Sequence, residues 1–95
     1  MKPYEIILQQ LGGRMFIAMT GAKLMCDGDY KLIAKIKGSK KVNHIEISLN
    51  GKDLYDIRFC KIRSLDLVTD YTMNDIYCDQ LVDIIEKETG LFLHF

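Results

Sequence analysis

Two stretches in the middle of the chain alternate between apolar and polar residues, and turn residues separate them. The alternating apolar residues are Ile45, Ile47 and Leu49 in the first stretch and Tyr55, Ile57 and Phe59 in the second. Because successive side chains of a strand point to opposite faces of a sheet, this pattern predicts a β-hairpin with one apolar face. A hairpin of this kind requires further elements to cover that face, and it constrains the fold more than any other feature of the sequence.

The turn between these two stretches conflicts with the apolar pattern. Asn50-Gly51 is typical of a two-residue turn, but that turn would place the two apolar sets on opposite faces of the sheet. Burial of a large apolar side chain is worth about 1.5–3 kcal/mol, so several of them outweigh a turn preference. We therefore predict a three-residue loop over residues 49–51 with a left-handed Gly51, which pairs Ser48 with Lys52 and Ile45 with Tyr55.

Helix and strand signals divide the N-terminal half. Pro3 suits the first turn of a helix, apolar residues recur at helical spacing as far as Leu11, and Gly12-Gly13 ends the segment. Residues 15–20 are apolar on both faces, which predicts a buried central strand. Residues 30–37 alternate and predict a strand whose outer face is basic and whose Tyr30 points inward.

The C-terminal third contains the signals of a helix. Thr72 to Asp75 has the form of a capping box, and the segment that follows has one apolar and one acidic face. Gly90 is predicted to end this helix in a left-handed conformation, and the apolar residues 91–95 to pack back onto the body. Residues 65–68 are predicted to form a last short strand.

Together these elements predict an α+β fold in a single domain over residues 1–95. We expect an antiparallel four- to five-stranded sheet, with a short N-terminal helix and a longer C-terminal helix packed on one face. No apolar run approaches the roughly 18 residues that a membrane span requires, and the N-terminus lacks the apolar region of a secretory signal. The three cysteines are odd in number and far apart, which indicates free thiols in the cytoplasm and neither disulfides nor a metal site.

The formal net charge is zero, but the charges are unevenly distributed. Residues 31–63 carry nine lysines and arginines against three acids, a net +6, and residues 64–95 carry one lysine against seven acids, a net −6. Such a division can let one half of a fold neutralise the other, or it can provide a binding surface.

Two charged sets are candidate binding sites. The acidic set recurs along the predicted C-terminal helix and is predicted to contact a basic protein surface; it comprises Asp75, Asp79, Asp83 and Glu86. The basic set lies on the predicted strands and is the alternative, a nucleic-acid site; it comprises Lys31, Lys35, Lys37, Arg58, Lys61 and Arg63. The aromatic residues among these strands, Tyr30 and Tyr55, are predicted to point inward, which does not suit base stacking.

No combination of residues in the sequence meets the requirements of a catalytic or cofactor site. Gly12-Gly13 lacks the strand before it and the helix after it that a phosphate-binding loop has, and it is interpreted as a helix end. Cys60 lies next to cations, but no histidine is near it in the sequence, so a structural role is predicted. We therefore predict a protein that is not an enzyme and has no cofactor.

Several segments resemble one group of proteins. The segments Leu8–Gly13 and Phe16–Lys23, with residues 47–56 and 75–91, are similar to small uncharacterised proteins encoded by phages, prophages and related mobile elements. The resemblance implies an origin but no activity or residue role. The resulting prediction is a protein-binding module of phage or mobile-element origin that modulates a host or phage protein. Self-association through an exposed strand edge is a further possibility.

Overall fold

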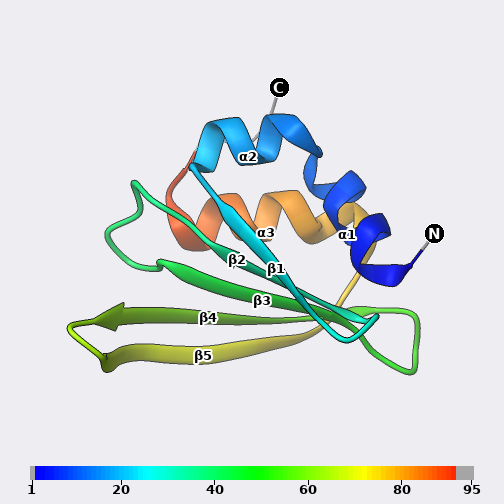
Figure 1. Cartoon of the computed structure of the whole chain (residues 1–95). Coiled ribbons are helices and arrows are strands. Elements are labelled where there is room, and N and C mark those ends of the chain that lie inside the picture. The colour runs from blue at the N-terminus through cyan, green and yellow to red at the C-terminus, as the bar shows by residue number, and fades with distance from the viewer. Residues whose placement is uncertain (1, 92–95) are drawn as a thin grey trace.

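The fold is a five-stranded antiparallel sheet with helices on one of its faces (Figure 1). This computed structural model describes residues 2–91. The helices are α1 (Pro3–Leu11), α2 (Arg14–Thr20) and α3 (Leu81–Thr89), and a 3-10 turn, η1 (Cys78–Gln80), precedes α3. The strands are β1 (Lys23–Asp27), β2 (Lys31–Lys35), β3 (His44–Leu49), β4 (Tyr55–Arg63) and β5 (Asp66–Ile76). The predicted α+β class is confirmed, and α2 and β1 are additions to it.

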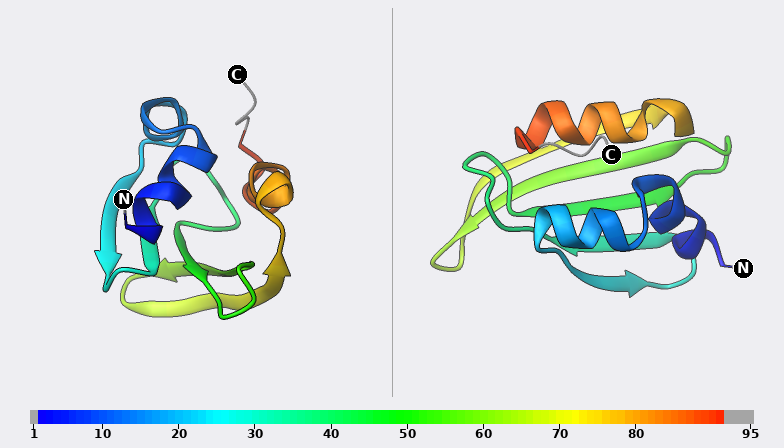
Figure 2. Two further views of the ribbon diagram at one scale, coloured as in Figure 1. Left: turned by 90° about the vertical axis from the view of Figure 1, so that its right-hand side faces the viewer. Right: turned by 90° about the horizontal axis from the view of Figure 1, so that it is seen from above.

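The strands follow one another in the sheet in the order β1-β2-β3-β4-β5. Figure 2 shows that α1 and α2 cover one side of the inner face and α3 covers the other. The core lies between the sheet and the helices. Its largest fully buried side chains are Ile7, Leu11, Phe16, Leu81 and Ile85 from the helices and Ile45, Ile47, Ile57 and Phe59 from the strands, with Val42 and Cys60.

The predicted N-terminal helix is confirmed as α1. Its last turn ends at Gly12, which is left-handed with φ of 113°. The next residue, Gly13, has φ of 59° and ψ of −125°, a combination that only glycine adopts readily. These two residues redirect the chain from α1 into α2.

The predicted central strand over residues 15–20 is wrong, because this segment belongs to α2. Phe16 and Thr20 are its buried residues, one helical turn apart, whereas Met15 and Met19 are exposed. The Thr20 hydroxyl donates a 2.7 Å hydrogen bond to the Phe16 carbonyl. A short apolar run does not distinguish a strand from a helix by composition alone, and here the spacing of the two buried residues is helical.

The hairpin of β3 and β4 keeps the predicted faces but has a different register. The two apolar sets share the inner face, and the pairs are Ile45 with Phe59, Ile47 with Ile57 and Leu49 with Tyr55. The predicted three-residue loop is wrong, since residues 50–54 connect the strands. Asn50 organises this loop, because its Oδ1 accepts hydrogen bonds from the backbone amides of Lys52 and Leu54 at 2.8 and 3.2 Å. The left-handed residue is Asp53 and not Gly51.

The basic strand predicted over residues 30–37 is observed as β2. Leu32 and Ala34 face the core as predicted, and Ile36 beyond the strand is also buried. Tyr30 is exposed, so its predicted inward orientation is wrong, whereas Tyr55 is buried as predicted. Tyr30 precedes β2 in the turn from β1 and therefore does not follow the alternation of the strand.

The capping box predicted at Thr72–Asp75 is wrong, because these residues belong to β5. The last strand is much longer than the predicted residues 65–68, and it pairs with β4 through Phe59–Tyr71 and Ile57–Met73. The helix therefore begins only at Leu81 and is shorter than predicted. Its end is confirmed, since Gly90 is left-handed with φ of 75°. Leu91 packs against the core, and residues 92–95 lie outside the described residues.

Tyr71 connects the sheet to α3. Its ring stacks on Phe59 with 5.2 Å between the ring centroids, and its hydroxyl donates a 2.7 Å hydrogen bond to a carboxylate oxygen of Glu88. Burial and the neighbouring carboxylate raise the pKa of the Tyr71 phenol from about 10 to about 12.

Ionisation of Tyr71 is expected to weaken the fold at high pH. The folded state holds the phenolic proton more tightly than the unfolded state, so this contribution to stability is complete below pH 10 and is lost as the pH rises to about 12. An ultraviolet titration of tyrosinate should therefore contain a component near pH 12 that disappears in Tyr71→Phe. Tyr30→Phe is the control, because Tyr30 is exposed. Persistence of the component in Tyr71→Phe would assign it to another residue.

Candidate binding surfaces

The outer face of the sheet, opposite the helices, is mainly charged. At its centre, the Glu46 carboxylate of β3 lies 3.4 Å from Lys31 Nζ, 3.0 Å from His44 Nε2 and 3.3 Å from Arg58 Nη1. Partial burial disfavours the Glu46 carboxylate, but the hydrogen bonds from His44 and Lys31 and the charges of Lys31 and Arg58 outweigh it and lower the pKa of Glu46.

Ion pairs between the two differently charged halves of the sequence extend this network. Arg58 binds Asp70 of β5 through Nε and Nη2, with both distances 2.8 Å, and Lys52 binds Asp75 at 3.2 Å. A two-pronged arginine–carboxylate contact is among the stronger surface ion pairs. The opposite charges of the two halves therefore neutralise each other in part within the fold.

The predicted acidic set does not lie on one helix face. Asp75 is in β5, where it also accepts a 2.9 Å hydrogen bond from the Asn50 side chain, and Asp79 is in η1. Only Asp83 and Glu86 are on α3, and both already take part in interactions. The predicted acidic stripe is wrong because β5 extends through Ile76 and delays the start of the helix.

The structure also separates the members of the predicted basic set. Lys31 and Arg58 are in the ion pairs around Glu46, and Lys61 Nζ donates to the carbonyl of Ser39 at 3.4 Å. Arg63 is exposed at the end of β4. Lys31 and Arg58 thus meet at a carboxylate, whereas Lys35 and Lys37 line one cavity without an ion pair among the described residues.

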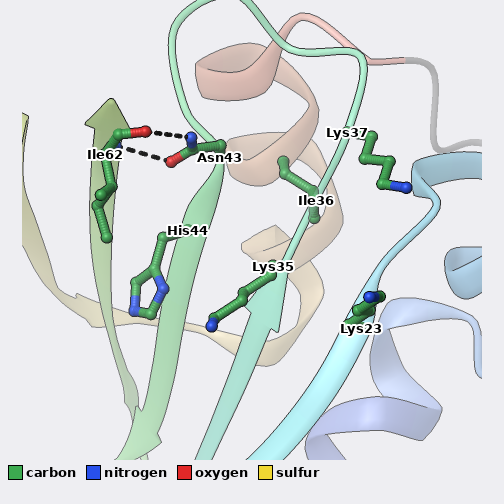
Figure 3. Close-up of a pocket in the computed structure, with 7 residues that line it drawn as sticks. All are labelled: Lys23, Lys35, Ile36, Lys37, Asn43, His44 and Ile62. Carbon is green, nitrogen blue, oxygen red and sulfur yellow. Dashed lines mark hydrogen bonds between the residues drawn. The ribbon is translucent and has the colours of Figure 1, made fainter. Parts of the chain in front are cut away.

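Lys35 and Lys37 line a cavity of about 350 Å³ at the end of the sheet where β2 and β4 end and β1 and β3 begin (Figure 3). We call it the basic cavity. Its lining residues are Lys23, Lys35, Ile36, Lys37, Asn43, His44 and Ile62. Lys23 belongs to β1, a strand that the sequence pattern did not reveal. Asn43 is fixed by two hydrogen bonds to the backbone of Ile62, at 2.7 and 2.9 Å.

His44 joins the basic cavity to the central ion-pair network. Its Nε2 contacts Glu46, whereas its Nδ1 is buried and has no hydrogen-bond partner among the described residues. An unpartnered buried polar atom is uncommon in folded proteins and costs free energy.

The hairpin of β4 and β5 ends in an apolar tip, which we define as Leu65, Leu67 and Val68. Leu65 is 99% exposed, Val68 61% and Leu67 50%. The two turn residues, Ser64 and Leu65, have φ of 51° and 71°, a conformation that favours glycine. Leu65 is thus a large apolar residue whose side chain gains no stability from burial and whose backbone is strained.

Cys60 is buried in β4 beside Asp70, with 3.7 Å between Sγ and Oδ1. Burial raises the pKa of its thiol, and although Arg58 opposes that shift, Asp70 adds to it. The thiol is therefore held protonated, as a structural cysteine requires. Within residues 2–91, no three histidine, cysteine or acidic residues are grouped as metal ligands. None of the described helices has the length and apolar character of a membrane span.

No family model, curated protein or solved structure matches this chain. The resemblance to proteins of phages and mobile elements therefore stays a prediction.

Proposed function

We propose that this protein is a non-enzymatic protein-binding module that receives an extended segment of a partner protein along the edge of β5 that no other described strand pairs with. The observation that carries the proposal is the combination of a long edge strand with the apolar tip at its beginning. An unpaired strand edge offers backbone donors and acceptors for strand addition, and neighbouring apolar side chains supply buried area.

Edge strands that do not bind are usually short or blocked. β5 has 11 residues and contains neither proline nor glycine, whereas the other edge strand, β1, has five residues. Leu67 and Val68 are consecutive residues of β5, so their exposed side chains flank an added strand on opposite faces of the sheet, and Leu65 lies before them in the turn. Binding would therefore bury apolar side chains that are exposed in the isolated protein.

The charge of β5 favours a basic partner segment over a second copy of this chain. β5 contains Asp66, Asp70 and Asp75 and no lysine or arginine. Asp70 and Asp75 are paired within the fold, and no ion pair of Asp66 is observed among the described residues. Two β5 edges would bring acidic strands together, which is unfavourable, whereas a basic segment would complement Asp66.

A selection from a random peptide library on the immobilised protein tests this proposal. We expect the enriched peptides to alternate apolar and basic residues and to protect the β5 amides from hydrogen exchange. Leu67→Asp and Val68→Asp should weaken their affinity about tenfold or more, because a charge in a buried contact is costly. These side chains are exposed in the free protein, so the substitutions should leave its stability within about 0.5 kcal/mol.

Met25→Asp is the matched control, because Met25 is an exposed apolar residue on the opposite edge strand. It should change affinity less than twofold. Equal losses in Met25→Asp and Val68→Asp, or peptides that protect only β1, would overturn the β5 assignment. If the protein dimerised as its concentration rose and Val68→Asp abolished the dimer, the segment bound at β5 would belong to a second copy of this chain and not to a partner protein.

Phage or mobile-element origin and a cytoplasmic location belong to the same proposal and rest on the resemblance and the free thiols. The acidic residue Asp79 is exposed and lies after β5, where it can add to the attraction of a basic partner. An extended nucleic-acid surface is less favoured, because Lys31 and Arg58 are already neutralised by carboxylates.

A further inference from the structure

The basic cavity concentrates positive charge that the fold does not neutralise. Among residues 2–91, no carboxylate forms an ion pair with Lys23, Lys35 or Lys37. On the same face, by contrast, Lys31 pairs with Glu46, and Arg58 pairs with Glu46 and Asp70. The three lysines come from β1, β2 and the segment after β2, and Figure 3 shows them around one end of the sheet. The Lys35 side chain points toward His44 and the Lys37 side chain toward the end of α2, so the lysines surround the cavity without their ammonium groups meeting. An anion that entered the cavity would attract all three.

The remaining lining residues make the cavity more than a group of surface lysines. Ile36 and Ile62 supply apolar surface. The Asn43 side chain donates to the Ile62 carbonyl and accepts from the Ile62 amide, which ties the residue before β3 to β4. The His44 ring lies in the lining, positioned by Glu46, and its buried Nδ1 has no partner. The cavity therefore combines cations with an apolar wall, the features of a ligand site, and one of its lining residues has a buried ring nitrogen without a partner among the described residues.

The volume of the cavity indicates the size of the ligand. About 350 Å³ exceeds what a bare inorganic anion needs and is at the lower end of the range for small-molecule sites. Flexible lysines around a cavity suit a phosphate group, because each ammonium can approach a different oxygen. The apolar wall suits a less polar body attached to that phosphate.

We propose that the basic cavity binds a small phosphate monoester. Lys23, Lys35 and Lys37 hold the phosphate, and Ile36 and Ile62 contact the body of the ligand. This site is separate from the β5 edge proposed above, and either assignment can fail without the other.

Isothermal titration calorimetry with adenosine monophosphate tests the proposal, with adenosine and inorganic phosphate as the two partial probes. Adenosine monophosphate should bind more tightly than either, because only it satisfies both the lysines and the apolar wall. Lys35→Gln and Lys37→Gln should each weaken binding about tenfold, since each removes a charge-assisted contact to phosphate. A rise in salt concentration should weaken binding further.

Lys87→Gln is the matched control, because it removes the same charge from an exposed position on α3, on the opposite face of the sheet. The affinity of Lys87→Gln for adenosine monophosphate should stay within twofold of that of the unsubstituted protein. In nuclear magnetic resonance spectra, the ring nitrogen signals of His44, assigned with His44→Gln, should move on binding.

Four results would overturn this assignment. The first is that adenosine monophosphate does not bind at millimolar concentration, and the second is that adenosine binds with the same affinity. The third is that Lys87→Gln loses as much affinity as Lys35→Gln and Lys37→Gln. The fourth is that a single-stranded oligonucleotide binds but adenosine monophosphate does not. The last would favour a nucleic-acid backbone as the ligand.

Discussion

Phe59→Ala is expected to lower the free energy of unfolding by about 3–5 kcal/mol, the usual effect of truncating a buried phenylalanine. Phe59 has no exposed surface and lies on the inner face of β4, between Ile45 of β3 and Tyr71 of β5. Its removal would leave a cavity where the sheet meets the helices, and it would also remove the ring against which Tyr71 stacks. Since domains of this size are stable by about 5–15 kcal/mol, the loss would be a large fraction of the total.

Chemical denaturation of the purified variants measures this effect. Val68→Ala is the control, because Val68 is exposed in the apolar tip and its truncation should change stability by less than about 0.5 kcal/mol. Phe59→Leu fills part of the space and should fall between the two. If Phe59→Ala and Val68→Ala had equal effects, the packing described for the inner face would be wrong.

Gly13→Ala is expected to destabilise the protein by about 1–3 kcal/mol through its backbone alone. With φ of 59° and ψ of −125°, Gly13 is in a region that a side chain makes unfavourable. No heavy atom lies within 4 Å of the position that a Cβ would take, so steric contact with a neighbour adds nothing. The substitution would strain the only connection between α1 and α2.

Gly51→Ala separates this backbone effect from the general effect of adding a methyl group. Gly51 also has no neighbour within 4 Å of its Cβ position, but its φ is not positive. Alanine there should be neutral or slightly stabilising, because it restricts the unfolded chain. Thermal unfolding of the two variants makes the comparison, and a similar loss in both would contradict the strain assigned to Gly13.

The elements that could be predicted from the sequence are those fixed by local signals that agree with tertiary packing. α1 begins at Pro3 and ends before Gly12, and α3 ends before Gly90. Proline restricts the backbone and glycine permits left-handed conformations whatever residues surround them. The shared face of β3 and β4 followed from the apolar alternation. Its register did not, because Asn50 forms side-chain hydrogen bonds that lengthen the loop without reversing the faces.

The elements that could not be predicted depend on distant partners. Thr72–Asp75 has the composition of a helix cap, but β4 offers a long unpaired edge, and pairing with it buries Ile76 and packs Tyr71 and Met73 against the core. In residues 15–20, burial of Phe16 and Thr20 against other helices and strands selects a helix over a strand. Local propensity is a weak signal where tertiary contacts of this kind compete with it.

The candidate sites were predictable only in part for the same reason. Lys35 and Lys37 could be identified from the basic alternation of one strand. Lys23 could not, because its strand had no clear pattern. The apolar tip was included in a predicted short strand, and only its exposure in the structure distinguishes it from core residues.

The strand order of the sheet has a consequence for how the chain is brought together. Each strand pairs only with the strand before or after it in the sequence, so every backbone ladder joins neighbouring segments. The contact of α1 with α3 is the main one between the two ends of the described chain, and it is made by side-chain packing and not by strand pairing. Each strand pairing therefore closes only a short loop, and the entropy cost of each of these steps is small. The longest loop is closed by the contact between α1 and α3, which can form after the strands of the sheet are already paired. Such predominance of local pairing accompanies rapid folding in small domains.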